Sequence, residues 1–228
     1  VIGQALLLTI PAGLVIFGVN DVYDYESDLR NPRKPSSEGF LLRKEHHSFV
    51  MRAAFASAVL LLGYSFLTSI ALGNFTNLFA TALIVALSFA YSAMPLRLKA
   101  KPPLDSFCNA AGVWSLMLLG FSHNSTLLQF PLKIYYACLG VMGMHAFCTI
   151  MDYSADKAAG TNTFAVKFGK RAAALFASLT CVLILLFSGI KSDLLRGLTF
   201  FALVLALLAA MKPKEAFVRK LFRTFFLV

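Results

Sequence analysis

Charged side chains are scarce in this sequence: Asp, Glu, Lys and Arg together make up 14% of its 228 residues, whereas 58% are hydrophobic. A soluble globular domain usually carries about 25% charged residues. The deficit indicates that most of the surface meets hydrocarbon rather than water, and it excludes a disordered chain or a coiled coil. We therefore expect an integral membrane protein.

Cysteine is also scarce, and its positions point to no metal site or disulfide. The sequence has 4 cysteines, and none of them stands in a C-x-x-C pattern, which argues against a zinc site or a disulfide framework. A glycine-rich phosphate-binding loop and a secretory signal pattern are also missing. Chemistry must therefore be sought among the few acidic and basic residues.

Apolar stretches are the dominant feature that is present. A helix needs about 20 apolar residues to cross hydrocarbon, and the stretches that meet this are 1–20, 48–72, 76–95, 104–121, 131–151, 171–190 and 194–211. A partial eighth opens near Phe217. We expect an all-α, polytopic transmembrane helical bundle forming a single domain over 1–228, and, because both ends fall inside apolar runs, one that is truncated at both ends.

Basic residues are unevenly distributed between the two sides of these spans. If the chain crosses at every span, one side of the membrane holds only 3 of the 21 Lys and Arg, and these are Lys133, Lys191 and Arg196. The positive-inside rule then places the opposite, basic loops in the cytoplasm. The net charge of +10 is thus explained by topology and not by nucleic-acid binding, and the basic run at 212–223 is interpreted in the same way.

Aspartates gather where the first span ends, in the segment NDVYDYESD. At roughly 100° per residue, Asn20, Asp21, Asp24 and Asp28 share one face of a helix. Like charges one turn apart destabilise a helix, so this face needs a cation. Hard oxygen ligands at such density suit Mg²⁺.

A second acidic segment, MDYSAD, ends the fifth span and places Asp152 and Asp156 one turn apart. Two such helix ends could hold Mg²⁺ and, through it, a diphosphate. Basic residues nearby are candidates for the diphosphate itself, and these are Arg33, Arg97, Lys99 and Lys157. The alternative for all of them is solvated charge that only sets the topology.

These residues resemble the UbiA superfamily of intramembrane prenyltransferases, whose members carry N-D-x-x-D-x-x-x-D on one helix and D-x-x-x-D on another. The sequence matches both motifs in full and in order. Tyr91 and Ser92, followed by basic residues, are similar to the family's tyrosine and lysine region. The resemblance covers residues 1–170 and makes the six motif residues the metal shell, with the five aspartates as catalytic ligands and Tyr91 as a further diphosphate contact.

The resemblance implies a nine-helix fold and a Mg²⁺-dependent enzyme of isoprenoid biosynthesis. Such an enzyme ionises an allylic polyprenyl diphosphate and transfers the prenyl group to a lipophilic acceptor. The string YDYESDLRNPRK is similar to members of the lycopene elongase type, which prenylate carotenoids. Aromatic quinone precursors, archaeal glycerolipids and tetrapyrroles stay open as acceptors, as does cyclisation of the diphosphate by a terpene-cyclase member.

A substrate cavity inside the bundle is expected to include Ser92, Asn109 and His145. His145 precedes Asp152 by seven residues and shares its helical face. A histidine inside a membrane also commonly bonds a neighbouring helix, and that alternative is open.

Two other function classes compete with the enzyme: a divalent-cation transporter or channel, and a scaffold in which the acids only pair with bases. Conduction paths usually place ionisable groups at mid-membrane depth. No predicted span carries a charge at its centre, so the sequence disfavours a transporter.

Overall fold

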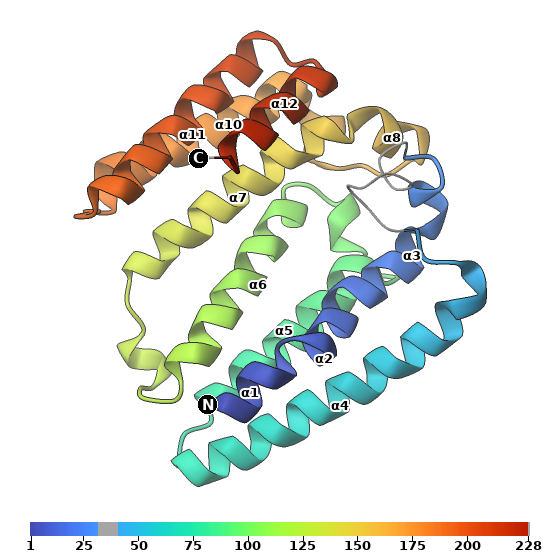
Figure 1. Cartoon of the computed structure of the whole chain (residues 1–228), viewed down its shortest axis with the longest axis vertical. Helices are drawn as coiled ribbons and strands as arrows, with labels where there is room; N and C mark the ends of the chain where they lie inside the picture. Colours follow the sequence, from blue (N-terminus) through green and yellow to red (C-terminus); the bar gives the residue numbers. More distant parts are fainter. Residues whose placement is uncertain (32–40, 228) are drawn as a thin grey trace. The chain divides into compact units, whose positions relative to one another are not determined.

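The computed structural model describes residues 1–31 and 41–227 of the chain (Figure 1). Within that part the chain is helical and contains no strand, which confirms the predicted all-α class. Two compact units divide it: the first comprises 1–98 and 111–131, and the second comprises 99–110 and 132–228. Helix α6 (Leu104–Phe121) contributes to both units.

The first unit is built around one long helix and the broken helix that packs along it. The elements that lie wholly in this unit are α1 (Ile2–Leu7), α2 (Ile10–Gly13), α3 (Val19–Asp28), α4 (His47–Leu72) and α5 (Thr76–Ser92). A π-helical segment, Leu14–Gly18, joins α2 to α3. Figure 1 shows α4 and α5 lying side by side.

Three long helices and three short ones lie wholly within the described part of the second unit. They are α7 (Lys133–Met151), α8 (Tyr153–Ala158), α9 (Phe164–Phe168), α10 (Lys170–Phe187), α11 (Asp193–Met211) and α12 (Glu215–Phe225). Helix α10 packs against both α7 and α11. Short 3-10 turns at Leu98–Ala100, Lys44–His46 and Leu127–Gln129 complete the helical structure.

Six helical segments of the described chain are long and apolar enough to cross a membrane. They are Ile2–Asp28, Lys44–Leu72, Leu104–Phe121, Lys133–Met151, Lys170–Phe187 and Asp193–Met211. Helix α5 corresponds to the predicted span at 76–95. It is apolar, but its 17 residues make it shorter than these six segments. Helix α12, where a partial eighth was expected, is amphipathic, since Val218 and Leu221 are buried while Lys220 and Arg223 are exposed.

Small side chains bring the helices of the second unit close together. Ala146 on α7 and Ala173 and Ala177 on α10 are buried in one hydrophobic cluster. A Cβ atom at Gly143 would collide with the side chain of Thr180. Small interface residues of this kind let transmembrane helices pack closely, where dispersion is the main attraction. This packing supports α7, from whose end the second aspartate motif extends.

Buried polar side chains join the helices of the first unit. Asn77 donates to Gln4 Oε1 at 2.9 Å and to Ser122 Oγ at 2.9 Å, and Gln4 Nε2 donates to Asn77 Oδ1 at 2.9 Å. Gln4 Nε2 also donates to Ser65 Oγ at 3.2 Å. Because hydrocarbon offers no alternative partners, these bonds orient the helices that carry them.

Candidate functional site

The first aspartate motif lies on one uninterrupted helix. All four motif residues fall within α3, from Val19 to Asp28, so the predicted helical stripe of Asn20, Asp21, Asp24 and Asp28 is present. Asp28 is buried and the other three are partly buried. A helix with three aspartates on one face carries mutual repulsion that a bound cation would relieve.

The region around Tyr91 and Ser92 reaches this stripe directly. Both residues lie at the end of α5, as predicted. Buried Ser92 donates from Oγ to Asn20 Oδ1 at 3.1 Å, which holds the asparagine in place at the start of the stripe. Tyr91 is partly buried.

Arg97 follows α5 and has an unusual backbone conformation, with φ at 39°. Its Nε is buried and has no hydrogen-bond partner within the described part of the chain. A buried guanidinium donor without a protein acceptor fits an anionic ligand. Arg33, the neighbouring candidate, lies outside the described residues.

The second motif surrounds a break between two helices. Helix α7 ends at Met151, and Asp152, with φ at −106° and ψ at 7°, separates it from α8. Asp156 lies one turn further along α8. The helix end predicted at this motif is therefore present, but the chain continues as a separate helix of 6 residues (Figure 1).

Asp156 is held by the segment that follows it. Thr163 donates from Oγ1 to Asp156 Oδ2 at 3.0 Å, and the backbone N–H of Thr161 donates to the Asp156 carbonyl at 2.8 Å. Burial raises the pKa of the Asp156 carboxyl to about 7; the Thr163 hydrogen bond opposes this shift and the nearby Asp152 charge adds to it. The negative charge of Asp156 is thus disfavoured unless a cation is close.

Lys99 supplies one such cation. It is buried, with 6% of its surface exposed, and its charge lowers the pKa of Asp156. Lys99, one of the predicted diphosphate contacts, is therefore a buried base near the Asp156 carboxylate.

Asp105 is a buried acid that sequence reasoning missed. It is completely buried, and its carboxylate accepts hydrogen bonds from the backbone N–H of Ser106 at 2.7 Å and of Phe164 at 2.8 Å. Because Thr163, at the start of α9, makes no side-chain cap, Asp105 caps α9 from another helix. The sequence did contain one indication that Asp105 is structurally important: it is an acidic residue at the second position of a largely apolar helix.

Lys157 lies differently from Lys99, although both were candidates for the same role. Lys157 is exposed, and its Nζ lies 5.8 Å from the centre of the Tyr153 ring. Lys170 Nζ lies over the same ring at 4.5 Å. The structure therefore distinguishes a buried lysine beside the motif from an exposed one.

An apolar cavity of about 580 Å³ lies within the second unit, among α7, α10, α11 and α12. Asn109 and His145, both predicted to face a cavity, are among its lining residues, whereas Ser92, predicted with them, is not. His145 Nδ1 pairs with Ser106 Oγ at 3.0 Å, and Asn109 Nδ2 donates to the Asp105 carbonyl at 2.9 Å. Ligand cavities are typically mostly apolar with a few polar groups, as this one is.

Comparison with known proteins identifies the family of this chain. A model of the UbiA prenyltransferase family matches residues 1–222. The chain belongs to this family.

The curated relatives described next are named for steps in carotenoid biosynthesis. The chain is 32% identical over 166 residues to the lycopene elongase/hydratase of Corynebacterium glutamicum, covering 72% of this chain and 56% of that protein. It is 36% identical over 182 residues to the C(50) beta-cyclic carotenoids biosynthesis protein LbtBC of Dietzia sp., covering 78% and 40%. The chain thus spans about half the length of the curated relatives it matches.

Solved structures show the same fold. A UbiA homolog from Archaeoglobus fulgidus bound to DMAPP and Mg²⁺ has a TM-score of 0.67 at 17% identity, covering 99% of this chain and 87% of that chain. The same homolog bound to GPP and Mg²⁺ has a TM-score of 0.65. This likeness confirms a UbiA-type helical architecture.

The motif residues fit the Mg²⁺ that the family implies. Among residues 1–31 and 41–227, no group of three or more His, Cys, Asp or Glu could hold a metal by itself. Mg²⁺ does not require one, because it prefers one or two carboxylates together with water and substrate phosphates. Asp152 and Asp156 form such a pair, and since burial raises the pKa of Asp156, a cation bound beside it would favour the charged carboxylate.

Proposed function

We propose that this chain carries out Mg²⁺-dependent transfer of a prenyl group from an allylic polyprenyl diphosphate to a lipophilic acceptor. The observation that carries the proposal is the partly buried Asp156, whose pKa responds to the nearby charges of Asp152 and Lys99, in a chain whose α3 presents the other family motif. Acids for a metal and a buried base for a phosphate are the parts that diphosphate ionisation requires.

In this proposal the aspartates of each motif hold Mg²⁺, with Asn20 as a neutral member of the α3 shell. Bound Mg²⁺ would supply Lewis-acid neutralisation of the diphosphate charge. Lys99 and Arg97 bind the diphosphate oxygens and stabilise the charge that develops as the group leaves. Arg33, Lys157 and Tyr91 are further candidates for the same role.

The transfer balances without an added oxidant or reductant. The bond between the allylic carbon and the diphosphate oxygen breaks, and its electron pair leaves with the diphosphate. The acceptor's π electrons form the new carbon–carbon bond, and the coupled product then loses a proton. Water would intercept the allylic cation, so an apolar environment is needed.

The cavity within the second unit suits a hydrocarbon chain. Its lining is mostly apolar, and its polar exceptions are Asn109, His145, Thr180 and Thr199. We propose that it accommodates a hydrocarbon part of the substrates. The hydrophobic surroundings would exclude water there.

The acceptor in this proposal is a carotenoid. Support comes from the names of the curated relatives, which are lycopene elongase/hydratase and a protein of C(50) carotenoid biosynthesis. Lycopene is accordingly the first acceptor to test, with an aromatic quinone precursor and a glycerolipid as competitors.

The test is an incubation of the full-length purified protein with radiolabelled allylic diphosphate, Mg²⁺ and each acceptor in turn. We expect a prenylated carotenoid and stoichiometric diphosphate. Both should disappear with chelator and in Asp24→Asn and Asp156→Asn, while Asp193→Asn, which changes an exposed residue, serves as the matched control. Diphosphate release without any acceptor would instead indicate a cyclase, and no turnover or diphosphate binding would contradict the proposal.

A further inference from the structure

We infer that Glu215, at the start of α12, is a positioning residue for the second aspartate motif, acting through Ser154. This inference rests on the proposed function in one respect, namely that Asp152 and Asp156 hold Mg²⁺. Glu215 is an acidic residue within the otherwise basic segment 212–223. From the sequence alone, the charges of this segment were interpreted as fixing the membrane topology.

Helix α8 cannot orient itself. It has 6 residues, and the break at Asp152 separates it from α7. A helix this short is unstable in isolation, since nucleation is unfavourable and few backbone bonds follow. The direction in which Asp156 points relative to Asp152 is therefore set by side chains from other elements.

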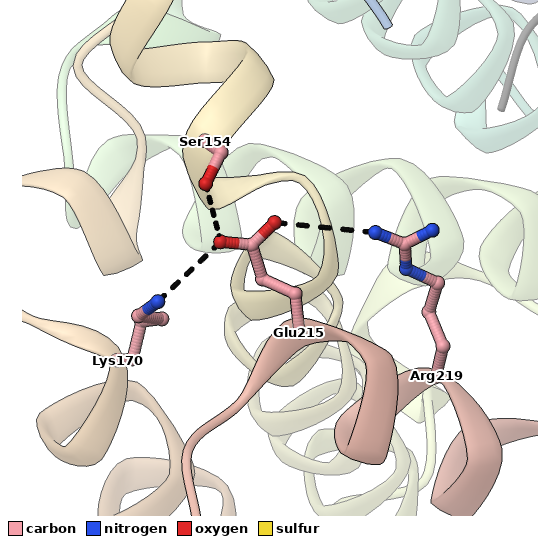
Figure 2. Close-up of polar contacts among 4 residues, drawn as sticks. All are labelled: Ser154, Lys170, Glu215 and Arg219. Carbon is pink, nitrogen blue, oxygen red and sulfur yellow. Dashed lines mark hydrogen bonds and ion pairs between the residues drawn. The ribbon is translucent and has the colours of Figure 1, made fainter. Parts of the chain in front are cut away.

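Glu215 is the centre of the contacts that reach α8 from α10 and α12, as Figure 2 shows. Ser154 Oγ donates to Glu215 Oε1 at 2.6 Å, and Lys170 Nζ lies 3.4 Å from the same oxygen. Arg219 NH2 lies 3.9 Å from Oε2. The Glu215 side chain is only 18% exposed, so solvent screens these contacts less than at an open surface.

The same contacts also fix the side chain of Tyr153. Lys170, which pairs with Glu215, lies over the Tyr153 ring at 4.5 Å. Tyr153 in turn packs against the hydrophobic cluster of the second unit. Residues 153 and 154 of α8 are thus both fixed by the Lys170–Glu215 pair, one through its ring and the other through its hydroxyl.

Ser154 is the point at which this support meets the motif, because it lies between Asp152 and Asp156 in D-Y-S-A-D. The opposite end of α8 is held by the Thr163 and Thr161 bonds to Asp156. Without Glu215, Ser154 loses its hydrogen bond, and the near end of α8 keeps the packing of Tyr153 but no polar anchor at Ser154. Residues that do not bind a metal themselves but orient the residues that do are important for affinity, and their loss weakens metal binding.

The first measurement is amide hydrogen exchange over residues 152–160 in metal-free protein, which needs neither substrate nor Mg²⁺. We expect Glu215→Ala and Ser154→Ala to accelerate exchange there, and the double variant to exchange no faster than Glu215→Ala. Glu215→Gln keeps an acceptor for Ser154 and should exchange more slowly than Glu215→Ala. Asp193→Ala, which removes an exposed carboxylate that pairs with Arg196, should leave this segment unchanged.

The second measurement is the Mg²⁺ concentration for half-maximal turnover. Glu215→Ala should raise it on the order of 10-fold, with kcat at saturating Mg²⁺ largely retained, whereas loss of folded protein would lower kcat and leave the midpoint unchanged. If Glu215→Ala fails to fold, Ser154→Ala provides the same comparison. Unchanged exchange together with an unchanged midpoint would overturn the inference, while a wild-type protein without Mg²⁺-dependent turnover would overturn the proposed function only.

Discussion

Burial separates residues that look alike in the sequence. Lys99 and Lys101 stand two positions apart in one loop, yet Lys99 is buried and Lys101 is exposed. Lys99 acts on the charge of Asp156. An exposed ammonium is screened by water and contributes little, so of these two lysines we propose only Lys99 as a group that assists diphosphate departure.

Replacing Lys99 by methionine keeps the length of the side chain and removes its charge. We expect kcat/KM for the allylic diphosphate to fall on the order of 100-fold, because a preorganised donor to the leaving group is lost. Lys101→Met is the matched control and should retain turnover. Steady-state kinetics on both variants checks this, and equal losses in the two would show that burial does not decide the role.

At the scale of elements, the two short helices after α7 depend on partners far away in the chain. Asp105 caps α9 through the N–H of Phe164, and Glu215 holds α8 through Ser154. Thr163, which begins α9, bonds Asp156 instead of capping its own helix. Helices α8 and α9 are therefore arranged as supports for one carboxylate.

Truncating Asp105 tests this arrangement. Asp105→Ala leaves the buried N–H of Phe164 without its acceptor, and we expect a loss of about 2 kcal/mol in stability. Asp105→Asn keeps one acceptor oxygen and should lose less. Thermal unfolding of the detergent-solubilised protein provides the measurement, with Asp193→Ala, whose carboxylate is 95% exposed, as the control; equal effects at the two positions would contradict the assigned cap.

At the scale of the whole molecule, the distribution of Lys and Arg predicts which loops face the cytoplasm. Helix α6 provides a direct test, because it runs from Leu104 to Phe121 and is flanked by Lys101 and Asn124. Both flanking residues are exposed.

The prediction is made for a background in which the 4 native cysteines are replaced. In intact cells or oriented vesicles, an impermeant thiol reagent should label Lys101→Cys only from the cytoplasmic side and Asn124→Cys only from the other side. Labelling of both from one side would contradict the predicted crossing by α6.

Local patterns allowed the sequence to determine the membrane class, the helical fold, most of the spans and both aspartate motifs. Helical periodicity alone places Asn20, Asp24 and Asp28 on one face, and apolar length alone predicts a span. The π-helical turn before α3 was not predicted in this way. The amphipathic pattern of α12 is present in the sequence, where Val218 and Leu221 recur at helical spacing, but it was interpreted as the start of a partial span.

Only the tertiary structure decided which polar residues support the motifs. The contacts of Asp105 with Phe164 and of Ser154 with Glu215 join positions 59 and 61 residues apart, and no local pattern encodes such a pairing. Burial likewise distinguished Lys99 from its neighbours, because exposure is a property of the packed chain and not of the residue. The sequence determined which ligands this protein offers, and the fold decided how they are held.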